Sequence, residues 1–165
     1  MTALAIEYFK FEEDFVEDNV RCIPMIVRFK LDACGVKLKL AEWSKFSPEE
    51  REALAVAPCH SEEQTDRYRS YLQHLIWWRT GNKATPIAIG ENPPWSVLSS
   101  IPELLSQRLY ECGHAISLAQ WQGLSTLQRF ALLKLSSSGH EHKNLAKALR
   151  EFGLVKDRVA AGADN

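Results

Sequence analysis

The sequence has no apolar run that approaches the length of a membrane-spanning helix. A span needs about 20 consecutive apolar residues, and charged residues, which make up 25% of the chain, interrupt its apolar stretches. The opening residues, MTALAIEYF, turn acidic at Glu7, which is not the pattern of a secretory signal. We therefore expect a cytoplasmic protein with reduced thiols and no membrane partner.

Net charge is also nearly absent. The chain has 20 Lys and Arg residues and 21 Asp and Glu residues, which gives a formal charge of -1 at pH 7. A near-neutral chain has no net field that attracts nucleic acid or an anionic surface. We therefore expect no nucleic-acid partner.

The motifs of common catalytic and cofactor sites are missing. The chain contains no Gly-x-Ser-x-Gly motif, no P-loop and no dinucleotide-binding glycine motif. Its cysteines form no Cys-x-x-Cys pair and no zinc-finger spacing. Three Cys/His pairs do occur, Cys59-His60, Cys112-x-His114 and His140-x-His142, but zinc needs four converging ligands. The sequence therefore predicts a protein without catalysis, cofactor or metal.

An internal repeat is the strongest positive signal. A shift of 78 positions aligns residues 23–54 with residues 101–132 without a gap, and twelve of the 32 pairs are identical. The identical pairs are Ile23/Ile101, Pro24/Pro102, Leu31/Leu109, Cys34/Cys112, Gly35/Gly113, Leu40/Leu118, Ala41/Ala119, Trp43/Trp121, Ser47/Ser125, Arg51/Arg129, Ala53/Ala131 and Leu54/Leu132. A repeat of this length indicates one supersecondary unit that is used twice.

Each copy is expected to begin with an amphipathic helix. Pro24 suits the start of a helix, and Gly35 can take the left-handed conformation that ends one. Apolar residues at helical spacing form the predicted buried face, with Arg28, Lys30 and Asp32 outside it. This face comprises Ile23, Ile26, Val27, Leu31 and Cys34, and in the second copy Ile101, Leu104, Leu105, Leu109 and Cys112. Cys34 and Cys112 are thus predicted to be core thiols.

After the first helix come a segment of alternating apolar and basic residues and then a capping box that begins a second helix. Val36–Leu40, VKLKL, is either a short extended link that pairs as a small ribbon or the lead-in to a short helix around Trp43. Ser47-Pro48-Glu49-Glu50 is a capping box, and Ser125 begins its counterpart. These boxes predict helices that end near Ala57 and Ser136.

A third helix completes each half. Ser61 and Gln64 cap a helix over residues 62–80 that ends at Gly81, and its counterpart runs from 142 to 152 and ends at Gly153. The inward face of the first of these helices is predicted to comprise Tyr68, Tyr71, Leu72, Leu75 and Trp78. We therefore predict one all-α domain, residues 1–165, of two related three-helix halves, about 21–81 and 99–153. Residues 82–98 form a Pro- and Gly-rich linker, and 156–165 a frayed tail.

Residues that differ between the copies are the candidates for function. The second copy has Ser99-Ser100 where the first has Arg21 and Cys22, and a serine where the first has Arg28. Cys22 lies near a helix start beside a cation, which favours a thiolate, although packing is the plainer explanation. Cys59, in a loop beside His60, is expected to be accessible to solvent.

Basic and aromatic residues suggest a partner-binding surface. The first copy is locally basic, which fits either a solvated face or a surface for an acidic partner. Its basic residues are Arg21, Arg28, Lys30, Lys37 and Lys39. Trp77 points about 100° away from the predicted inward face of its helix. It is therefore either buried between the halves or an exposed anchor for a partner.

Three segments carry a resemblance to a known family. RCIPMIVRFKLD, CGVKLKL and SGHEHKNL stand at residues 21–32, 34–40 and 138–145. With them, residues 9–154 resemble the nitrate reductase-associated proteins of cyanobacteria and proteobacteria. The resemblance implies a small cytoplasmic protein encoded beside assimilatory nitrate reductase, with a role in maturation, molybdenum-cofactor insertion or activity of that enzyme. The family has no catalytic residues to carry over.

Two functional hypotheses follow. The first is an accessory protein that binds nitrate reductase, with Arg21, Cys22, Arg28, Lys30 and Trp77 as candidate contact residues. The alternative is a thiol- or metal-dependent delivery or sensing protein that uses Cys22 or Cys59-His60.

Overall fold

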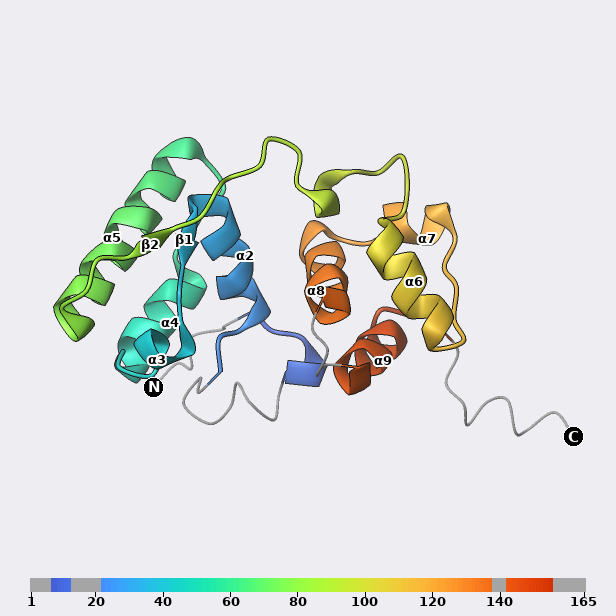
Figure 1. Ribbon diagram of the computed structural model, residues 1–165, viewed down its shortest axis with the longest axis horizontal. Coiled ribbons are helices and arrows are strands. Elements are labelled where there is room, and N and C mark those ends of the chain that lie inside the picture. Colours follow the sequence, from blue (N-terminus) through green and yellow to red (C-terminus); the bar gives the residue numbers. More distant parts are fainter. Residues whose placement is uncertain (1–6, 13–21, 138–141, 156–165) are drawn as a thin grey trace, which may run out of the picture. The chain divides into compact units, whose positions relative to one another are not determined.

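The chain divides into two compact units, residues 1–90 and 91–165. The structure, a computed structural model, describes residues 7–12, 22–137 and 142–155. The described residues are mostly helical (Figure 1), which confirms the predicted all-α class. The division falls inside the segment 82–98 that the sequence predicts to be a linker.

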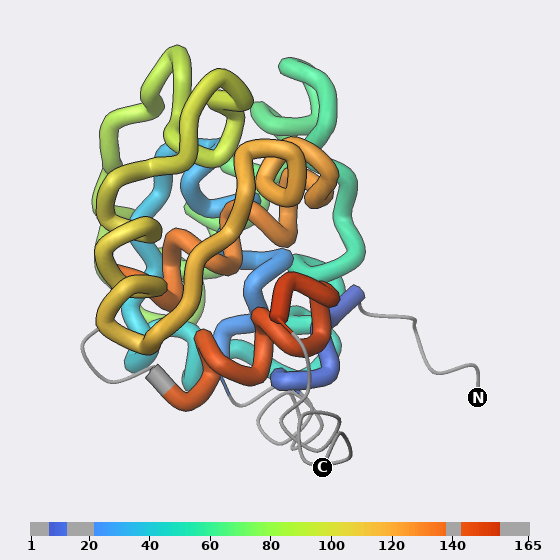
Figure 2. Tube along the Cα trace, turned by 90° about the vertical axis from the view of Figure 1, so that its right-hand side faces the viewer, coloured from blue at the N-terminus to red at the C-terminus, as the bar shows by residue number. Residues whose placement is uncertain are grey.

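Both units have the same order of α-helices. The first unit contains η1 Lys10–Glu12, α2 Met25–Cys34, β1 Val36–Lys37, α3 Leu40–Trp43, α4 Pro48–Val56, α5 Glu62–Thr80 and β2 Thr85–Pro86. The second contains η2 Pro94–Ser96, α6 Glu103–Glu111, α7 Leu118–Gln122, α8 Thr126–Ser137 and α9 His142–Glu151. The helices of the second unit follow one another from yellow to red in Figure 2.

Each unit has four α-helices among its described residues, whereas three were predicted. The additional helices are the short α3 and α7, which surround Trp43 and Trp121. A short helix around Trp43 was one of the two interpretations of the VKLKL segment. The other interpretation also holds in part, because Val36 and Lys37 form a strand before that helix begins.

Local capping explains where the long helices begin and end. Ser47 Oγ accepts the backbone N–H of Glu50 at 3.1 Å, and Glu50 Oε1 accepts the N–H of Ser47 at 2.8 Å. Ser61 and Ser125 form the same reciprocal pair of bonds with Gln64 and Gln128. The predicted helix over residues 62–80 is confirmed, with Gly81 at its end at a φ of 74°.

A two-stranded ribbon closes the first unit. β1 pairs antiparallel with β2, with Val36 opposite Pro86 and Lys37 opposite Thr85. The N–H of Ile87 also donates to Gly35 O at 2.9 Å. The first part of the segment 82–98 is therefore a strand of the first unit, while its later residues form η2, which packs on α8 in the second unit.

The core of the first unit lies between α2, α4 and α5. Trp43, Leu54, Leu72 and Ile76 are fully buried there, together with Val27 of α2. Burial of one such side chain is worth about 1.5–3 kcal/mol relative to exposure. Val36 and Leu38 are buried while Lys37 and Lys39 are exposed, so the predicted alternation is confirmed, but it ends before Leu40, which is exposed.

The second unit packs α6 and α9 against α8. Its fully buried side chains include Leu105, Trp121 and Phe130. The ring of Trp95, from η2, meets the ring of Phe130 edge-on at 4.9 Å. Leu104, predicted for the buried face, is 40% exposed. This prediction was wrong because α6 buries a narrower stripe than its apolar residues suggest.

Three successive helices of the second unit begin 78 residues after three successive helices of the first. Met25, Leu40 and Pro48 begin α2, α3 and α4, and Glu103, Leu118 and Thr126 begin α6, α7 and α8. In each unit an arginine lies over the buried tryptophan: Arg51 over Trp43 and Arg129 over Trp121, both at 5.9 Å. Gly35 and Gly113 have φ values of 74° and 76°.

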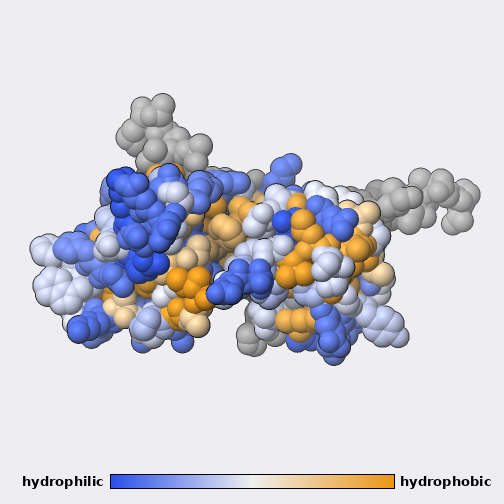
Figure 3. Space-filling model, turned by 90° about the horizontal axis from the view of Figure 1, so that it is seen from above, coloured by the Kyte–Doolittle hydropathy of each residue, from blue (hydrophilic) through white to orange (hydrophobic). Residues whose placement is uncertain are grey.

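Among the described residues, no helix is both long enough and apolar enough to cross a membrane. Apolar residues are nevertheless exposed on both units. On the second unit the large ones are Leu98, Leu104, Tyr110 and Leu118. Figure 3 shows apolar side chains gathered among hydrophilic ones on one face of this unit.

Candidate functional site

The structure distributes the predicted contact residues over different environments. Arg21 lies outside the described residues, and Cys22 is half-buried just before α2. Arg28 is also half-buried, and its Nε donates to Ile23 O at 3.1 Å. Lys30 is buried on α2, whereas Trp77 is exposed near the end of α5. Of the four described residues, Lys30 is therefore covered by the fold and Trp77 is open to solvent.

Lys30 is 6% exposed, so the expectation that it lies outside the buried face of its helix was wrong. Its Nζ donates to Ala55 O at 2.7 Å and to Ala57 O at 2.6 Å. These carbonyls belong to the end of α4, where helical carbonyls lack partners within the helix. The periodicity of α2 could not reveal this, because the partners come from another helix.

Burial lowers the pKa of Lys30 below its ordinary value, while the nearby Cys59 and Glu7 favour its charged form. The ammonium group also lies 5.8 Å from the centre of the Tyr68 ring. A cation at that distance is attracted by the ring face. The lysine is therefore held in place from two sides, by α4 and by α5.

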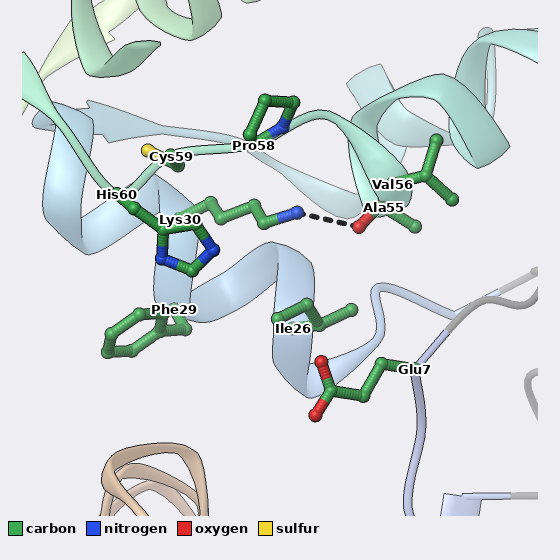
Figure 4. A pocket seen from close by; sticks show the side chains of 9 residues that line it. All are labelled: Glu7, Ile26, Phe29, Lys30, Ala55, Val56, Pro58, Cys59 and His60. Atoms are coloured by element: carbon green, nitrogen blue, oxygen red, sulfur yellow. Dashed lines mark hydrogen bonds between the residues drawn. The ribbon is translucent and has the colours of Figure 1, made fainter.

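A pocket of about 240 Å³ opens at this lysine. Figure 4 shows its lining, which comes from the N-terminal segment, from α2, and from the end of α4 with the α4–α5 connection: Glu7, Ile26, Phe29, Lys30, Ala55, Val56, Pro58, Cys59 and His60. Cys59 and His60, singled out as a Cys/His pair, both line it. Sequence patterns could not indicate this pocket, because its walls come from three separate segments.

Cys59 is 8% exposed, so the expectation of an accessible thiol was wrong. The connection between α4 and α5 folds its side chain inward, where Sγ lies 3.6 Å from Thr65 Oγ1. His60 next to it is exposed at the pocket. The pair therefore combines a shielded thiol with an accessible imidazole.

The remaining cysteines fall into opposite environments. Cys34 is buried as predicted, and burial, with a contribution from Cys59, raises the pKa of its thiol to about 11. It therefore stays protonated at neutral pH. Cys112 is exposed, so the prediction of a core thiol was wrong there. It follows the last residue of α6, at the helix C-cap, and points away from the core.

Metal-ligating side chains do not gather in the part of the chain that the structure describes, where no three Cys, His, Asp or Glu residues lie close enough to share an ion. His140 lies outside the described residues. The Cys59-His60 and Cys112-x-His114 pairs therefore each lack further ligands among the described residues.

An aromatic face on α5, formed by Trp77 and Trp78, is exposed among the described residues of the first unit. Trp77 is 57% exposed and Trp78 is 64% exposed. The His74 ring stacks on Trp78, with 6.2 Å between centroids and 21° between planes. The predictions that Trp78 and Tyr71 face inward were wrong, whereas Tyr68, Leu72 and Leu75 of the same predicted face are buried. Ile76, which was not predicted, is buried with them.

Glu12 is a buried carboxylate whose role the sequence indicates only in part. Glu12 is 1% exposed, and its Oε1 accepts the backbone N–H of Met25 at 2.8 Å, at the start of α2. Its Oε2 accepts the N–H of Phe9 at 3.0 Å. It therefore caps a helix that begins 13 residues later in the chain.

The fold and these sites define an all-α protein of two helical units that carries an exposed aromatic face and a lysine-containing pocket. The chain belongs to the family of conserved nitrate reductase-associated proteins, whose family model matches residues 8–152. The comparisons with curated proteins and with solved structures give no significant match.

Proposed function

We propose that this protein is an accessory protein of assimilatory nitrate reductase. It binds that enzyme in the cytoplasm and supports its maturation, cofactor insertion or activity without catalysing a reaction of its own. The observation that carries the proposal is the family match, which spans nearly the whole chain. The missing catalytic motifs and the exposed aromatic side chains of α5 are consistent with a role in binding.

The aromatic face of α5 is the contact surface that the geometry favours. Tryptophan and tyrosine are enriched among the residues that dominate binding energy at interfaces. Trp77 and Trp78 together offer a large, rigid apolar area at low cost in conformational entropy. Arg79, which follows them, is held by Glu50 Oε1 at 3.0 Å and borders the same end of the helix.

The basic part of the predicted surface is smaller than expected. Arg28 retains a partly exposed guanidinium group, and Lys37 and Lys39 are exposed. We do not place Lys30 in direct contact with a partner protein, because its ammonium group donates hydrogen bonds to carbonyls at the end of α4. Arg28 therefore remains the charged residue of choice for a charge-reversal variant.

Co-purification with the reductase tests the proposal. A tagged chain is expected to retain apo- or holo-nitrate reductase from nitrate-grown cells at low salt, and deletion of its gene is expected to reduce nitrate reduction. The proposal fails if neither form of the enzyme is retained and the deletion leaves nitrate reduction intact.

Variants then test the surface. Replacing both Trp77 and Trp78 with alanine is expected to weaken retention at least about tenfold, as loss of a central aromatic anchor does. Tyr110→Ala, which removes an 84% exposed aromatic ring from the second unit, is the matched control and is expected to leave retention unchanged. Equal effects of the two changes would remove α5 from the interface.

A second candidate function, a thiol- or metal-dependent delivery or sensing role, is favoured by one observation: Cys59 and His60 line the same pocket. Metal analysis of untagged protein addresses it. Stoichiometric metal that is lost in Cys59→Ser would support this role over simple binding. Substoichiometric metal, with full function in both Cys22→Ser and Cys59→Ser, would end it.

We further infer that the two units are copies of one helical unit. The twelve identities at an offset of 78 residues and the matching starts of three successive helices support this inference. On this basis, residues 78 apart are compared below as equivalent positions.

A further inference from the structure

The pocket at Lys30 contains a buried cation that is only partly satisfied. An ammonium group carries three N–H donors. Two of them form hydrogen bonds with Ala55 O and Ala57 O. Within the described residues, Lys30 has no third hydrogen-bond acceptor and no carboxylate within 4.0 Å. The Tyr68 ring, at 5.8 Å, attracts the charge but is not a strong hydrogen-bond acceptor. A buried donor without an acceptor is costly, so an oxygen ligand in the pocket would be stabilised.

The second unit shows that this arrangement is not required by the fold. Its own pocket is lined in part by Leu104, Leu133, Lys134 and Ser137, which come 78 residues after Ile26, Ala55, Val56 and Cys59 of the first pocket. Of these pairs, Ile26 and Leu104 lie within the aligned repeat. The residue equivalent to Lys30 is Arg108, which donates to Ser136 O at 3.0 Å.

Arg108, however, also pairs with the Glu111 carboxylate at 3.0 Å. The position equivalent to Glu111 in the first unit is Ala33. Both units therefore use a basic residue to hold the end of a helix, but among the described residues only the second unit places a carboxylate within 4.0 Å of it. In the first unit the corresponding charge faces a pocket.

The walls of the pocket limit what can bind there. Ile26, Phe29, Val56 and Pro58 provide apolar surface, and His60 adds a polar group. Figure 4 shows the His60 ring beside the aliphatic stem of Lys30, with Phe29 and Ile26 along α2. At about 240 Å³, the pocket is smaller than the roughly 300–1,000 Å³ of a typical drug-sized ligand site. A small molecule with one anionic end and a short apolar body matches these dimensions.

We propose that this pocket binds a small organic carboxylate, with the carboxylate on the Lys30 ammonium group and the apolar body against Ile26, Phe29 and Val56. Glu7 is the competing group: its exposed carboxylate lines the pocket edge and interacts electrostatically with Lys30. The ligand carboxylate takes over this electrostatic role at shorter range. Removal of the Glu7 charge therefore favours the ligand.

Residue-resolved NMR titration of the full chain with benzoate tests the site. Benzoate is expected to shift the amide signals of Lys30, Val56 and His60. Benzamide, which has the same shape without the charge, and acetate, which lacks the apolar body, are each expected to bind at least about tenfold more weakly. No shifts at these amides, or equal binding of benzamide, would overturn the proposal.

Variants in opposite directions make the test independent of folding defects. Lys30→Met is expected to abolish the benzoate response, and Glu7→Gln, at an exposed position, to tighten binding about two- to fivefold. Lys37→Met removes an exposed lysine of the same unit and is expected to change nothing. Weaker or unchanged binding in Glu7→Gln, or equal losses in Lys30→Met and Lys37→Met, would overturn the assignment. The measurement uses the isolated protein, so its outcome is separate from that of the proposed function.

Discussion

At the scale of single residues, buried charges in both units are bonded to the backbone. Glu12 accepts the N–H of Met25 at the start of α2, and Lys30 donates to the carbonyls at the end of α4. Arg129 donates to Trp95 O at 2.7 Å and also to Leu124 O. Because a buried backbone group without a partner is costly, these side chains stabilise helix ends and connections that the apolar core does not reach.

Two glycines that lie 78 residues apart, Gly35 and Gly113, give a prediction about strain. Both have a positive φ, which costs an alanine about 1–2 kcal/mol. At Gly35 a Cβ would lie 2.9 Å from Ile87 O and 2.8 Å from Ile89 Cγ1, whereas at Gly113 it would meet nothing within 4 Å. We therefore expect Gly113→Ala to lower the free energy of unfolding by about 1 kcal/mol and Gly35→Ala by at least about 2 kcal/mol.

Urea denaturation monitored by tryptophan fluorescence measures both changes. Alanine at Gly35 also forces the backbone of β2 away from β1, so the loss should be accompanied by faster amide exchange at Ile87, whose N–H bonds to Gly35 O. Equal losses of stability at the two sites would contradict the close approach of residues 87–89.

At the scale of elements, one carboxylate joins the start of α4 to the end of α5. Glu50 Oε1 accepts the N–H of Ser47 and the Nε of Arg79. Partial burial acts to raise the pKa of Glu50, but the hydrogen bonds from Ser47 and Arg79 outweigh it, and the pKa lies below its ordinary value. The N-terminal cap of one helix is thereby coupled to the last turn of another.

Acid titration of stability tests this coupling. A carboxyl group whose folded pKa is depressed stabilises the fold above its unfolded pKa, about 4.3 for Glu, and this contribution is lost as the pH falls through the folded pKa. We expect Glu50→Gln to lower the free energy of unfolding by about 1 kcal/mol at pH 7 and the difference from the parent protein to shrink below about pH 4.

Glu49→Gln is the matched control for that prediction. Glu49 is the exposed neighbour in the same helical turn. Its neutralisation should leave the pH dependence of unfolding close to that of the parent protein. A difference between Glu50→Gln and the parent that stays constant down to pH 3 would show that the carboxylate itself is not what couples the two helices.

At the scale of the whole molecule, the chain forms two compact units, each built around one buried tryptophan. Trp43 and Trp121 are both 0% exposed, and each is covered by an arginine. Since each unit has its own core, we expect each to respond to damage in that core as a separate cooperative segment.

Hydrogen exchange measured by mass spectrometry checks this expectation. Trp43→Phe, a reduction in buried volume, is expected to accelerate exchange in α2, α4 and α5. Trp121→Phe is expected to do the same in α6, α8 and α9. Each change should lower local protection by about 1–3 kcal/mol. Acceleration that spreads evenly over residues 22–155 in either variant would mean that the chain unfolds as one segment.

Much of the secondary structure could be predicted because its signals are local. The capping boxes at Ser47, Ser61 and Ser125, and glycines such as Gly35 and Gly81, act within one turn of the helix that they begin or end. The candidate site was far less predictable. Its walls come from three separate segments of the chain. Helical periodicity indicates neither the burial of Cys59 in a connection nor the hydrogen bonds of Lys30 to α4.

The amino-acid sequence by itself therefore determined the long helices and their order, since helix caps and helical periodicity depend on residues a few positions apart. Only the tertiary structure decided the burial of several side chains. Lys30 and Cys59 are buried and Trp78 and Cys112 exposed, each against expectation, because burial depends on the neighbouring elements and not on the helix that carries the residue. The lysine pocket and the aromatic face of α5 both depend on this unexpected burial of Lys30 and exposure of Trp78.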